Sequence, residues 1–264
     1  MYNIMVKLLN IIDSYEDQSA TEVLVADYIL RNIENVPAMS IYQLAEACHT
    51  SPATISRFCK KLGDMSYKEL KENCQSVREY QSNEINKDIL QQSSHYTDIN
   101  ENFNMMINSL IETKKLINWA DIEKTVTLFE NAQKIAFFGI GYSHFAAREA
   151  QYKFTRLGKY CTAYSNFDNQ LREAKRLTNK DVAFIISFSG ATSFIVNLKN
   201  IMQKHGIKVI ALTSEPDSYI TIGADVILRV SSLQNKLFNS PIIQDLSIMS
   251  MINSIYLAYI GRMK

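Results

Sequence analysis

The hydrophobic and polar residues follow two different patterns along the chain. Up to about residue 80, apolar residues recur at every third or fourth position, which is the spacing of amphipathic helices. From about residue 101, short apolar runs of strand length alternate with stretches of helical spacing. We therefore expect a helical domain over residues 1–80, a polar linker over 81–100 and an α/β domain over 101–264.

The N-terminal pattern predicts helices whose ends carry recognisable signals. Residues 1–17 favour a short amphipathic helix over a signal peptide, because Lys7 interrupts the apolar stretch and no small-residue cleavage site follows. Hydroxyl residues at helix starts, and proline or glycine near the ends, mark the others. The expected helices are 19–36, capped by Ser19 and ended by Pro37; 40–48, capped by Ser40; 51–62, capped by Ser51, with Pro52 in the first turn and Gly63 as the stop; and 66–80.

The C-terminal pattern predicts a doubly wound parallel sheet of the flavodoxin-like type. Short apolar strands that alternate with helices are typical of a parallel sheet covered on both faces. The overall class is therefore α/β, with an all-α domain in front. The expected strands are 134–141, 159–165, 181–189, 207–214 and 224–230, and the expected helices are 101–118, 121–132, 143–157, 168–177, 191–205, about 217–223 and 241–260.

The composition is ordinary for a soluble globular protein, with 47% hydrophobic and 21% charged residues. Since the net charge is only +1, any basic surface for nucleic acid must be local. The four cysteines form no CxxC motif, so we expect reduced thiols in a cytosolic, cytoplasmic protein, with no cofactor and no metal. The last long apolar stretch contains Gln244, Asp245 and Asn253, which favours a buried or partner-facing helix over a membrane span.

The segments 40–48 and 51–62, joined by the tight turn CHTS, have the spacing of a helix-turn-helix. The second helix of such a motif lies in the major groove of DNA, where short hydroxyls and arginine read bases or phosphates and lysines contact phosphates. Ile55, Phe58, Cys59 and Leu62 would point inward. The alternative is an ordinary helical pair with a solvated basic face. The predicted DNA-binding residues are Ser51, Ala53, Thr54, Ser56, Arg57, Lys60, Lys61 and Lys68.

The segment SIYQLAEACHTSPATISRFCKKLGDMSYKELK resembles the helix-turn-helix of RpiR-type transcriptional regulators. The likeness covers roughly residues 20–80 and includes the run SRFCKKLG and the YKELK that follows. It departs at Asp64 and Met65, where such proteins usually have a smaller or an aromatic residue after the glycine, and this affects the lead-in to the next helix more than the reading surface. The resemblance implies double-stranded operator DNA as a partner.

Two strand-to-helix junctions, GIGYS and SFSGAT, are rich in glycine and hydroxyl residues. Glycine lets the backbone approach a ligand, and a helix N-terminus offers free N–H groups to an anion. If the two junctions are adjacent at the carboxyl edge of the sheet, they converge on one anion. A dinucleotide-binding fingerprint is not supported, because His144 stands at the position of the third glycine, and neither a P-loop nor a nucleophile elbow is present.

The pair of junctions resembles the sugar isomerase (SIS) domain, in which SxSGxT holds the phosphate of a phosphosugar. The likeness covers about 125–260 and includes YKFTRLGKYCTAYSNFDNQL. It implies phosphate contacts from the three hydroxyls of SFSGAT, close backbone approach at its glycine, and a sugar or phosphate contact from the serine of GIGYS. Plain helix capping by Ser189 is the alternative. The predicted sugar-phosphate site consists of Gly139, Gly141, Ser143, Ser187, Ser189, Gly190 and Thr192.

An isomerase would need a general base with a pKa near neutrality, and the candidates are His144, Glu149, His205 and Glu215. None falls in a pattern that indicates catalysis, so we predict no catalytic residue. A helix-turn-helix followed by a SIS domain resembles an RpiR-type regulator that binds a phosphorylated sugar effector without turnover. The alternative is a phosphosugar isomerase or lyase with an accessory helical domain. We also expect a homodimer or homotetramer, joined through the C-terminal helix and residues 101–132.

Overall fold

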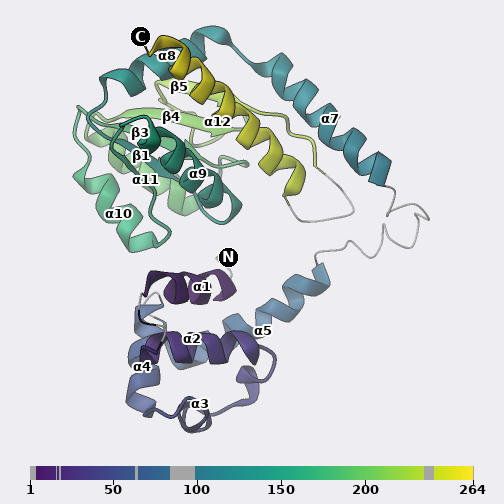
Figure 1. Ribbon diagram of the computed structural model, residues 1–264, viewed down its shortest axis with the longest axis vertical. Coiled ribbons are helices and arrows are strands. Elements are labelled where there is room, and N and C mark those ends of the chain that lie inside the picture. Colours follow the sequence, from purple (N-terminus) through teal and green to yellow (C-terminus); the bar gives the residue numbers. More distant parts are fainter. Residues whose placement is uncertain are drawn as a thin grey trace. The chain divides into compact units, whose positions relative to one another are not determined.

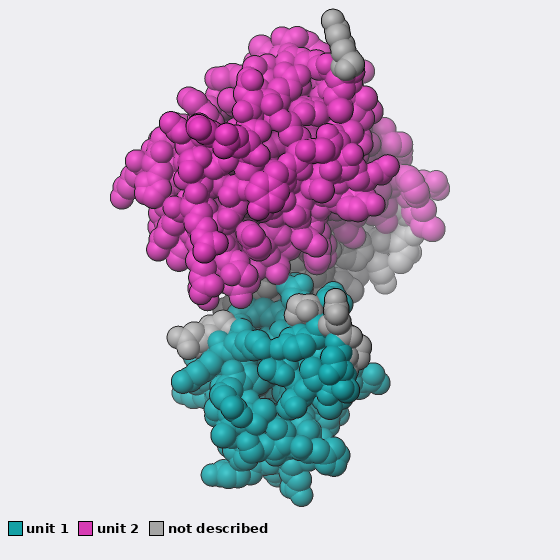
Figure 2. Space-filling view, turned by 60° about the vertical axis from the view of Figure 1, so that its left-hand side comes forward, with its two compact units in different colours: residues 1–87 teal, residues 88–264 magenta. Residues whose placement is uncertain are grey.

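The computed structural model describes residues 4–15, 17, 19–62, 65–83, 99–234 and 241–263. The chain separates into unit 1, residues 1–87, and unit 2, residues 88–264, which Figure 2 shows in two colours. Most of the predicted linker, and the predicted stop at Gly63, lie outside the described residues. Each unit has its own hydrophobic core, so each is considered by itself below.

The described residues of unit 1 form helices joined by turns and loops, with no strand (Figure 1). Its core is formed where the apolar faces of the helices meet, and Ile55, Phe58 and Cys59 of the predicted recognition helix are buried there. Burial of the Cys59 thiol raises its pKa to about 11, so this side chain behaves as a packing group. The elements are α1 (Ile4–Ser14), α2 (Thr21–Arg31), the 3₁₀ helix η1 (Val36–Ala38), α3 (Ile41–Ala47), α4 (Pro52–Lys61) and α5 (Tyr67–Asn83).

The caps predicted for α3 and α4 are confirmed, and the one predicted for α2 is wrong. Ser40 accepts a hydrogen bond from the Gln43 N–H, and the Gln43 side chain accepts one from the Ser40 N–H, which completes a capping box. Ser51 accepts a hydrogen bond from the Thr54 N–H. Ser19 instead donates its hydroxyl to Asp17, and α2 begins one residue after an uncapped Ala20. α2 also ends at Arg31, before Pro37, which lies in η1.

Unit 2 contains a parallel sheet with the strand order β2-β1-β3-β4-β5. This order confirms the doubly wound, flavodoxin-like prediction. Nearly every strand residue is buried, as expected for a sheet covered on both faces. The strands are β1 (Ile135–Phe138), β2 (Cys161–Thr162), β3 (Val182–Ile186), β4 (Lys208–Thr213) and β5 (Val226–Arg229), so β2 is much shorter than the predicted 159–165.

The two faces of the sheet are covered by different helices (Figure 1). Side chains that alternate along the strands point to opposite faces. Phe137 and Phe184 pack with α8, α9 and α12, whereas Phe138 and Ile185 pack with α10 and α11. The helices are α7 (Ile99–Leu116), α8 (Trp119–Asn131), α9 (Tyr142–Arg156), α10 (Phe167–Arg176), α11 (Ser193–Lys204) and α12 (Ile242–Arg262).

The short helix predicted near 217–223 is wrong, because these residues form successive turns. The N–H of Ile220 donates to the carbonyl oxygen of Gly190, outside the segment, at 3.2 Å. Gly223 has a left-handed backbone, with a φ of 71°. The buried ammonium of Lys199 donates to the carbonyl oxygens of Tyr219 and Ile222. Tertiary hydrogen bonds therefore replace the local ones that a helix would need.

α7 lies along α12 at the outside of unit 2 (Figure 1). The hydroxyls of Ser109 and Ser247 meet at 2.5 Å, and the Thr113 hydroxyl accepts a hydrogen bond from the N–H of Ser231 after β5. α7 thus presents small polar residues to its neighbour. In the described ranges, no helix has both the length and the apolar character needed to span a bilayer.

Candidate functional site

The predicted recognition helix α4 exposes the side chains assigned to DNA. Ala53, Ser56, Arg57 and Lys60 are exposed, while the opposite face of α4 is buried in unit 1. The Arg57 guanidinium donates to the Thr54 hydroxyl at 3.2 Å, which orients it across the first turns of the helix. α3 packs against α4, as in a helix-turn-helix. The exposed face therefore has the donors and cations that groove reading requires.

Five of the predicted DNA residues have side-chain partners within unit 1, since Ser51, Thr54, Lys61 and Lys68 join Arg57 in this respect. The Ser51 hydroxyl caps α4 and meets the Thr54 hydroxyl at 3.0 Å. Lys61 donates to Glu22 at 3.2 Å and to the hydroxyl of Tyr15. Lys68 lies 3.7 Å from Glu72 in an exposed ion pair. Lys60 has no such partner among the described residues and remains the more available cation for a phosphate.

The turn between α3 and α4 contains a conformational feature that the sequence pattern did not suggest. His49 has a φ of 50°, the one positive value among described residues other than glycine. Histidine tolerates this left-handed region better than most residues, but glycine adopts it more readily. The turn that positions α4 is therefore slightly strained.

The two glycine- and hydroxyl-rich junctions of unit 2 lie side by side. β1 and β3 are neighbours in the sheet, with Phe138 opposite Ile185, and both junctions leave the sheet at its carboxyl edge. Since β2 lies on the other side of β1, the strand order reverses at this point. In open α/β sheets, such a switch point is where ligands bind. The two junctions are thus adjacent at the carboxyl edge, which is the condition under which they would converge on one anion.

The junction after β1 makes a sharp turn into α9. A side chain at Gly139 would meet the backbone of Ser143 at 2.6 Å. Gly141 precedes α9 with φ 59° and ψ −127°, a conformation restricted to glycine, and no side chain caps the helix. Ser143 is half-buried in the first turn. This arrangement leaves first-turn N–H groups of α9 for an anion.

The hydroxyl groups of the junction after β3 do not cap α11, the helix that follows. α11 begins at Ser193, and its N-cap Thr192 makes no side-chain cap bond. Ser189 is exposed, and its one hydrogen bond among the described residues is a long one, 3.4 Å, accepted from the N–H of Ala191. Ser187 is buried, and its hydroxyl has no partner among the described residues. Helix capping by Ser189 therefore does not explain this cluster of hydroxyls.

A third segment completes the wall around Gly190, and the sequence pattern gave no sign of it. Gly190 has a φ of 60°, and a side chain there would lie 2.1 Å from the hydroxyl oxygen of Ser218. The hydroxyls of Thr213 and Ser214 both donate to the carbonyl oxygen of Phe188. Glycine at 190 is thus required both by its backbone conformation and by the close approach of the turn after β4.

The four candidate general bases lie in unsuitable environments. His144 is buried at the start of α9, where burial and then Arg148 lower its pKa to about 4, and its Nδ1 has no partner among the described residues. Such an imidazole is neutral at pH 7 and a weak base. Glu149 is exposed and paired with Lys153. His205 is exposed as the residue after α11, and Glu215 is exposed in the loop after β4. In the described ranges no cluster of His, Cys, Asp and Glu could hold a metal ion.

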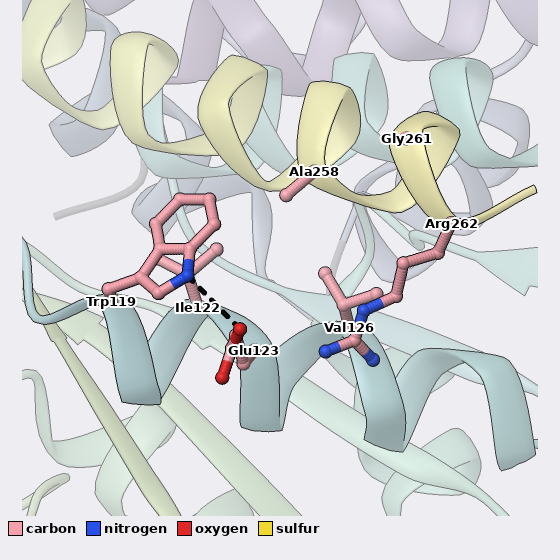
Figure 3. Close-up of a pocket in the computed structure, with 7 residues that line it drawn as sticks. All are labelled: Trp119, Ile122, Glu123, Val126, Ala258, Gly261 and Arg262. Atoms are coloured by element: carbon pink, nitrogen blue, oxygen red, sulfur yellow. Dashed lines mark hydrogen bonds between the residues drawn. The ribbon is translucent and has the colours of Figure 1, made fainter.

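Unit 2 also has a pocket of about 260 Å³ between α8 and α12, shown in Figure 3. Its polar groups are already engaged, since the Trp119 indole donates to Glu123 at 3.1 Å and Arg262 donates to Thr127 at 2.8 Å. The carboxylate of Glu123 would also repel a phosphate. None of the predicted sugar-phosphate residues lines it, the lining being Trp119, Ile122, Glu123, Val126, Ala258, Gly261 and Arg262.

Comparison with known protein families identifies both parts of the chain. Residues 5–80 match the helix-turn-helix domain of the rpiR family, and residues 128–258 match the SIS domain. The first match contains α3 and α4 with their turn, and the second contains the whole sheet with both junctions.

Individual relatives agree with the family matches. The chain is 34% identical over 212 residues to the HTH-type transcriptional regulator TTE0211 of Caldanaerobacter subterraneus, covering 80% of this chain and 75% of the other. It is 25% identical to the regulator RpiR of Escherichia coli K12, over 81% and 72% of the two chains. The solved structure of Vibrio vulnificus NanR complexed with ManNAc-6P has the same fold, with a TM-score of 0.60, 23% identity, and coverage of 99% and 92%.

Proposed function

The chain belongs to the RpiR family of helix-turn-helix transcriptional regulators with a SIS domain, and on this basis we propose that a phosphosugar bound in unit 2 controls the affinity of unit 1 for operator DNA. The observation that carries this proposal is the pair of adjacent junctions after β1 and β3, where α9 and α11 lack side-chain caps and hydroxyl side chains gather at the carboxyl edge of the sheet. A phosphate has the charge and the acceptor oxygens that such donors require.

The proposed phosphate site uses Ser187, Ser189 and Thr192 as hydroxyl donors and Gly190 for close backbone approach. Ser143, with the turn at Gly139 and Gly141, supplies the second wall. The NanR structure, which is a complex with ManNAc-6P, supports a phosphosugar as the class of ligand. The nature of the donors supports the same class, because they neutralise a phosphate by hydrogen bonds and helix N-termini.

The proposed DNA surface is the exposed face of α4. Arg57 is the residue that we expect to read a base or a phosphate, and Lys60 is expected to contact a phosphate. Ser51, Ala53, Thr54 and Ser56 supply small side chains that let α4 approach the groove. Lys61 and Lys68 add positive charge at the margin, in competition with Glu22 and Glu72.

We expect binding without turnover, in keeping with relatives that are named transcriptional regulators. A phosphosugar isomerase or lyase is the alternative, and the depressed pKa of His144 argues against that residue as its base. Incubation of the protein with each binding phosphosugar, followed by analysis of the sugar, separates the two. Conversion that disappears in His144→Ala or Glu149→Ala would establish an enzyme.

Self-association is proposed to use the outer face of α7. Ile99, Phe103, Ile107 and Ile111 follow one another at intervals of four residues, and their exposed fractions run from 69% to 46%. A homodimer or homotetramer would cover this stripe and pair two reading helices on a symmetric operator. Sedimentation should show that Phe103→Asp dissociates the oligomer, whereas Ile222→Asp, at an exposed turn, leaves it intact. A monomeric wild-type protein at micromolar concentration would contradict this.

The central experiment compares ligand binding with DNA binding. Calorimetry with a panel of phosphosugars identifies the ligand, and operator binding is then measured with and without it. Ser189→Ala should weaken ligand binding by about tenfold or more, because one charge-assisted hydrogen bond contributes roughly 1.5–3 kcal/mol. Ser254→Ala, whose hydroxyl donates within α12, is the control. Equal ligand affinity in wild type and Ser189→Ala would contradict the proposed phosphate site.

A further inference from the structure

The buried side chain of Gln170 has one polar atom that is bonded and one that is not. The residue is 1% exposed. Its Nε2 donates to the carbonyl oxygen of Gly139 at 3.1 Å, whereas its Oε1 is buried without a hydrogen-bond partner among the described residues. A backbone carbonyl can only accept, so the NH₂ group of the carboxamide must face Gly139. This contact fixes the direction in which Oε1 points.

α10 places Gln170 beside both junctions of the proposed phosphosugar site. This helix follows β2, the neighbour of β1 on the side away from β3, and packs against α11. In its first turn the ring of Phe167 contacts the ring of Phe194, the second residue of α11, at 4.5 Å between centroids. One turn later Gln170 reaches Gly139 of the first junction. Gln170 therefore lies between the elements that follow β1 and β3.

A buried acceptor without a donor is unusual enough to need an explanation. Most buried polar atoms in folded proteins are hydrogen-bonded, and an unpaired one destabilises the fold. Among the described residues, four other buried side chains have an unpaired polar atom: His144 and Ser218 belong to segments of the same site, since His144 lies in the first turn of α9 and Ser218 packs on Gly190, whereas Arg229 ends β5 and Gln244 lies in α12. Three of these five unpaired atoms therefore lie in segments of the site, where a ligand would supply the missing partners.

We infer that Oε1 of Gln170 accepts a hydrogen bond from a hydroxyl of the sugar, which makes Gln170 a specificity residue of the phosphosugar site; the inference rests on the proposed function. The phosphate and the sugar of such a ligand differ in the hydrogen-bonding groups that they offer. The phosphate oxygens mainly accept hydrogen bonds at neutral pH, so they pair with the hydroxyls and N–H groups of the junctions. A carboxamide oxygen accepts as well, so it needs the donor that only the sugar carries.

The test measures sugar and phosphate recognition separately. Glucose 6-phosphate, fructose 6-phosphate, glucosamine 6-phosphate, ribose 5-phosphate and inorganic phosphate are titrated into the full-length protein by calorimetry. In Gln170→Met, which has a similar volume but no polar atoms, affinity for the tightest sugar phosphate should fall about tenfold. Affinity for inorganic phosphate should stay within about twofold. Gln151→Met is the matched control. The Nε2 of Gln151 also donates to a backbone carbonyl oxygen, that of Cys161, but at the amino end of β2, away from the carboxyl edge where the site lies.

Each result decides the matter. An equal loss of affinity for sugar phosphate and inorganic phosphate would mean that Gln170 only positions Gly139, and it would overturn the inference. Unchanged affinities would do the same, since water would then satisfy Oε1. If wild type binds none of the five probes, the proposed function fails and the inference with it. Should Gln170→Met not fold by circular dichroism, Gln170→Asn, which keeps the amide but retracts the oxygen, should show the same selective loss.

Discussion

Gly190→Ala should destabilise unit 2 far more than the same change at another glycine with a similar backbone. The new Cβ would lie 2.1 Å from the hydroxyl oxygen of Ser218 and 2.3 Å from its Cβ, so the turn after β4 must move. The left-handed backbone, with φ 60°, adds strain of roughly 1–2 kcal/mol, and overpacking adds about 1–3 kcal/mol. Together they predict a loss of about 2–5 kcal/mol in the free energy of unfolding.

Gly206→Ala is the control that separates the two contributions. Gly206 follows α11 with a φ of 69°, and a Cβ there would meet nothing within 4 Å, so only the backbone strain applies. Ser218→Gly provides a rescue, since it removes both atoms that clash. Its hydroxyl has no partner among the described residues, so its removal alone should be mild.

Urea unfolding of these variants can be followed by tryptophan fluorescence. Trp119 is the single tryptophan of the chain and lies in unit 2, so the signal reports on that unit. We expect the order of stability to be wild type, then Gly206→Ala, then Gly190→Ala, with the double variant Gly190→Ala/Ser218→Gly near Gly206→Ala. If Gly190→Ala is no worse than Gly206→Ala, or if Ser218→Gly fails to rescue it, the close packing of this turn is refuted.

Three further predictions concern single side chains. Arg57→Ala should weaken operator binding by about 1–3 kcal/mol in a gel-shift titration. Arg31→Ala, which breaks an exposed ion pair with Asp27, should leave operator binding unchanged. Equal operator affinities of wild type and Arg57→Ala would mean that α4 does not read DNA. His49→Gly should raise the thermal midpoint of unit 1, by relief of roughly 1 kcal/mol of backbone strain, and no change would show that the turn is unstrained. His144 has a pKa of about 4 in the folded chain and near 6.5 when unfolded, so the unfolded chain binds more protons between these two values. The free energy of unfolding of unit 2 should therefore fall by roughly 1.4 kcal/mol for each pH unit as the pH drops through that interval. Urea midpoints at pH 7 and pH 5 should show a smaller loss of stability in His144→Asn than in wild type, and an identical loss would refute the depressed pKa of His144.

The parts of the fold that local signals determine were predictable from the sequence. Ser40 and Ser51 sit directly before regular apolar patterns, and both cap their helices. The buried strands are recognisable in the sequence as short apolar runs, and their alternation with helices is sufficient to predict a parallel sheet. Ser19 has the same hydroxyl group as Ser40 and Ser51, but it donates to Asp17 instead of capping α2. The local pattern does not show which of these two interactions is preferred.

The parts that depend on contacts between distant segments were not predictable. Residues 217–223 have a helix-like pattern, yet Ile220 donates its N–H to Gly190, which lies 30 positions earlier in the chain. The two junctions could be found by their glycines and hydroxyls, because those residues have unusual roles at a strand-to-helix turn. Gln170 and Ser218 could not, since each is an ordinary polar residue until the fold buries it. The strand order alone brings them to the site.

The strand order also has a consequence for how the chain folds as it is synthesised. β1 pairs with β3, and the segment between them includes α9, β2 and α10, so the centre of the sheet forms only after a long loop has closed. Most contacts in the core of unit 1 join helices that are close in the chain, such as α1 with α2 and α3 with α4, although α1 also packs against α5. Local contacts form faster than distant ones, and the N-terminal unit leaves the ribosome first. A nascent chain should therefore carry a folded unit 1 before unit 2 has folded, and a pulse-labelling experiment on stalled chains would show protection in residues 41–62 earliest.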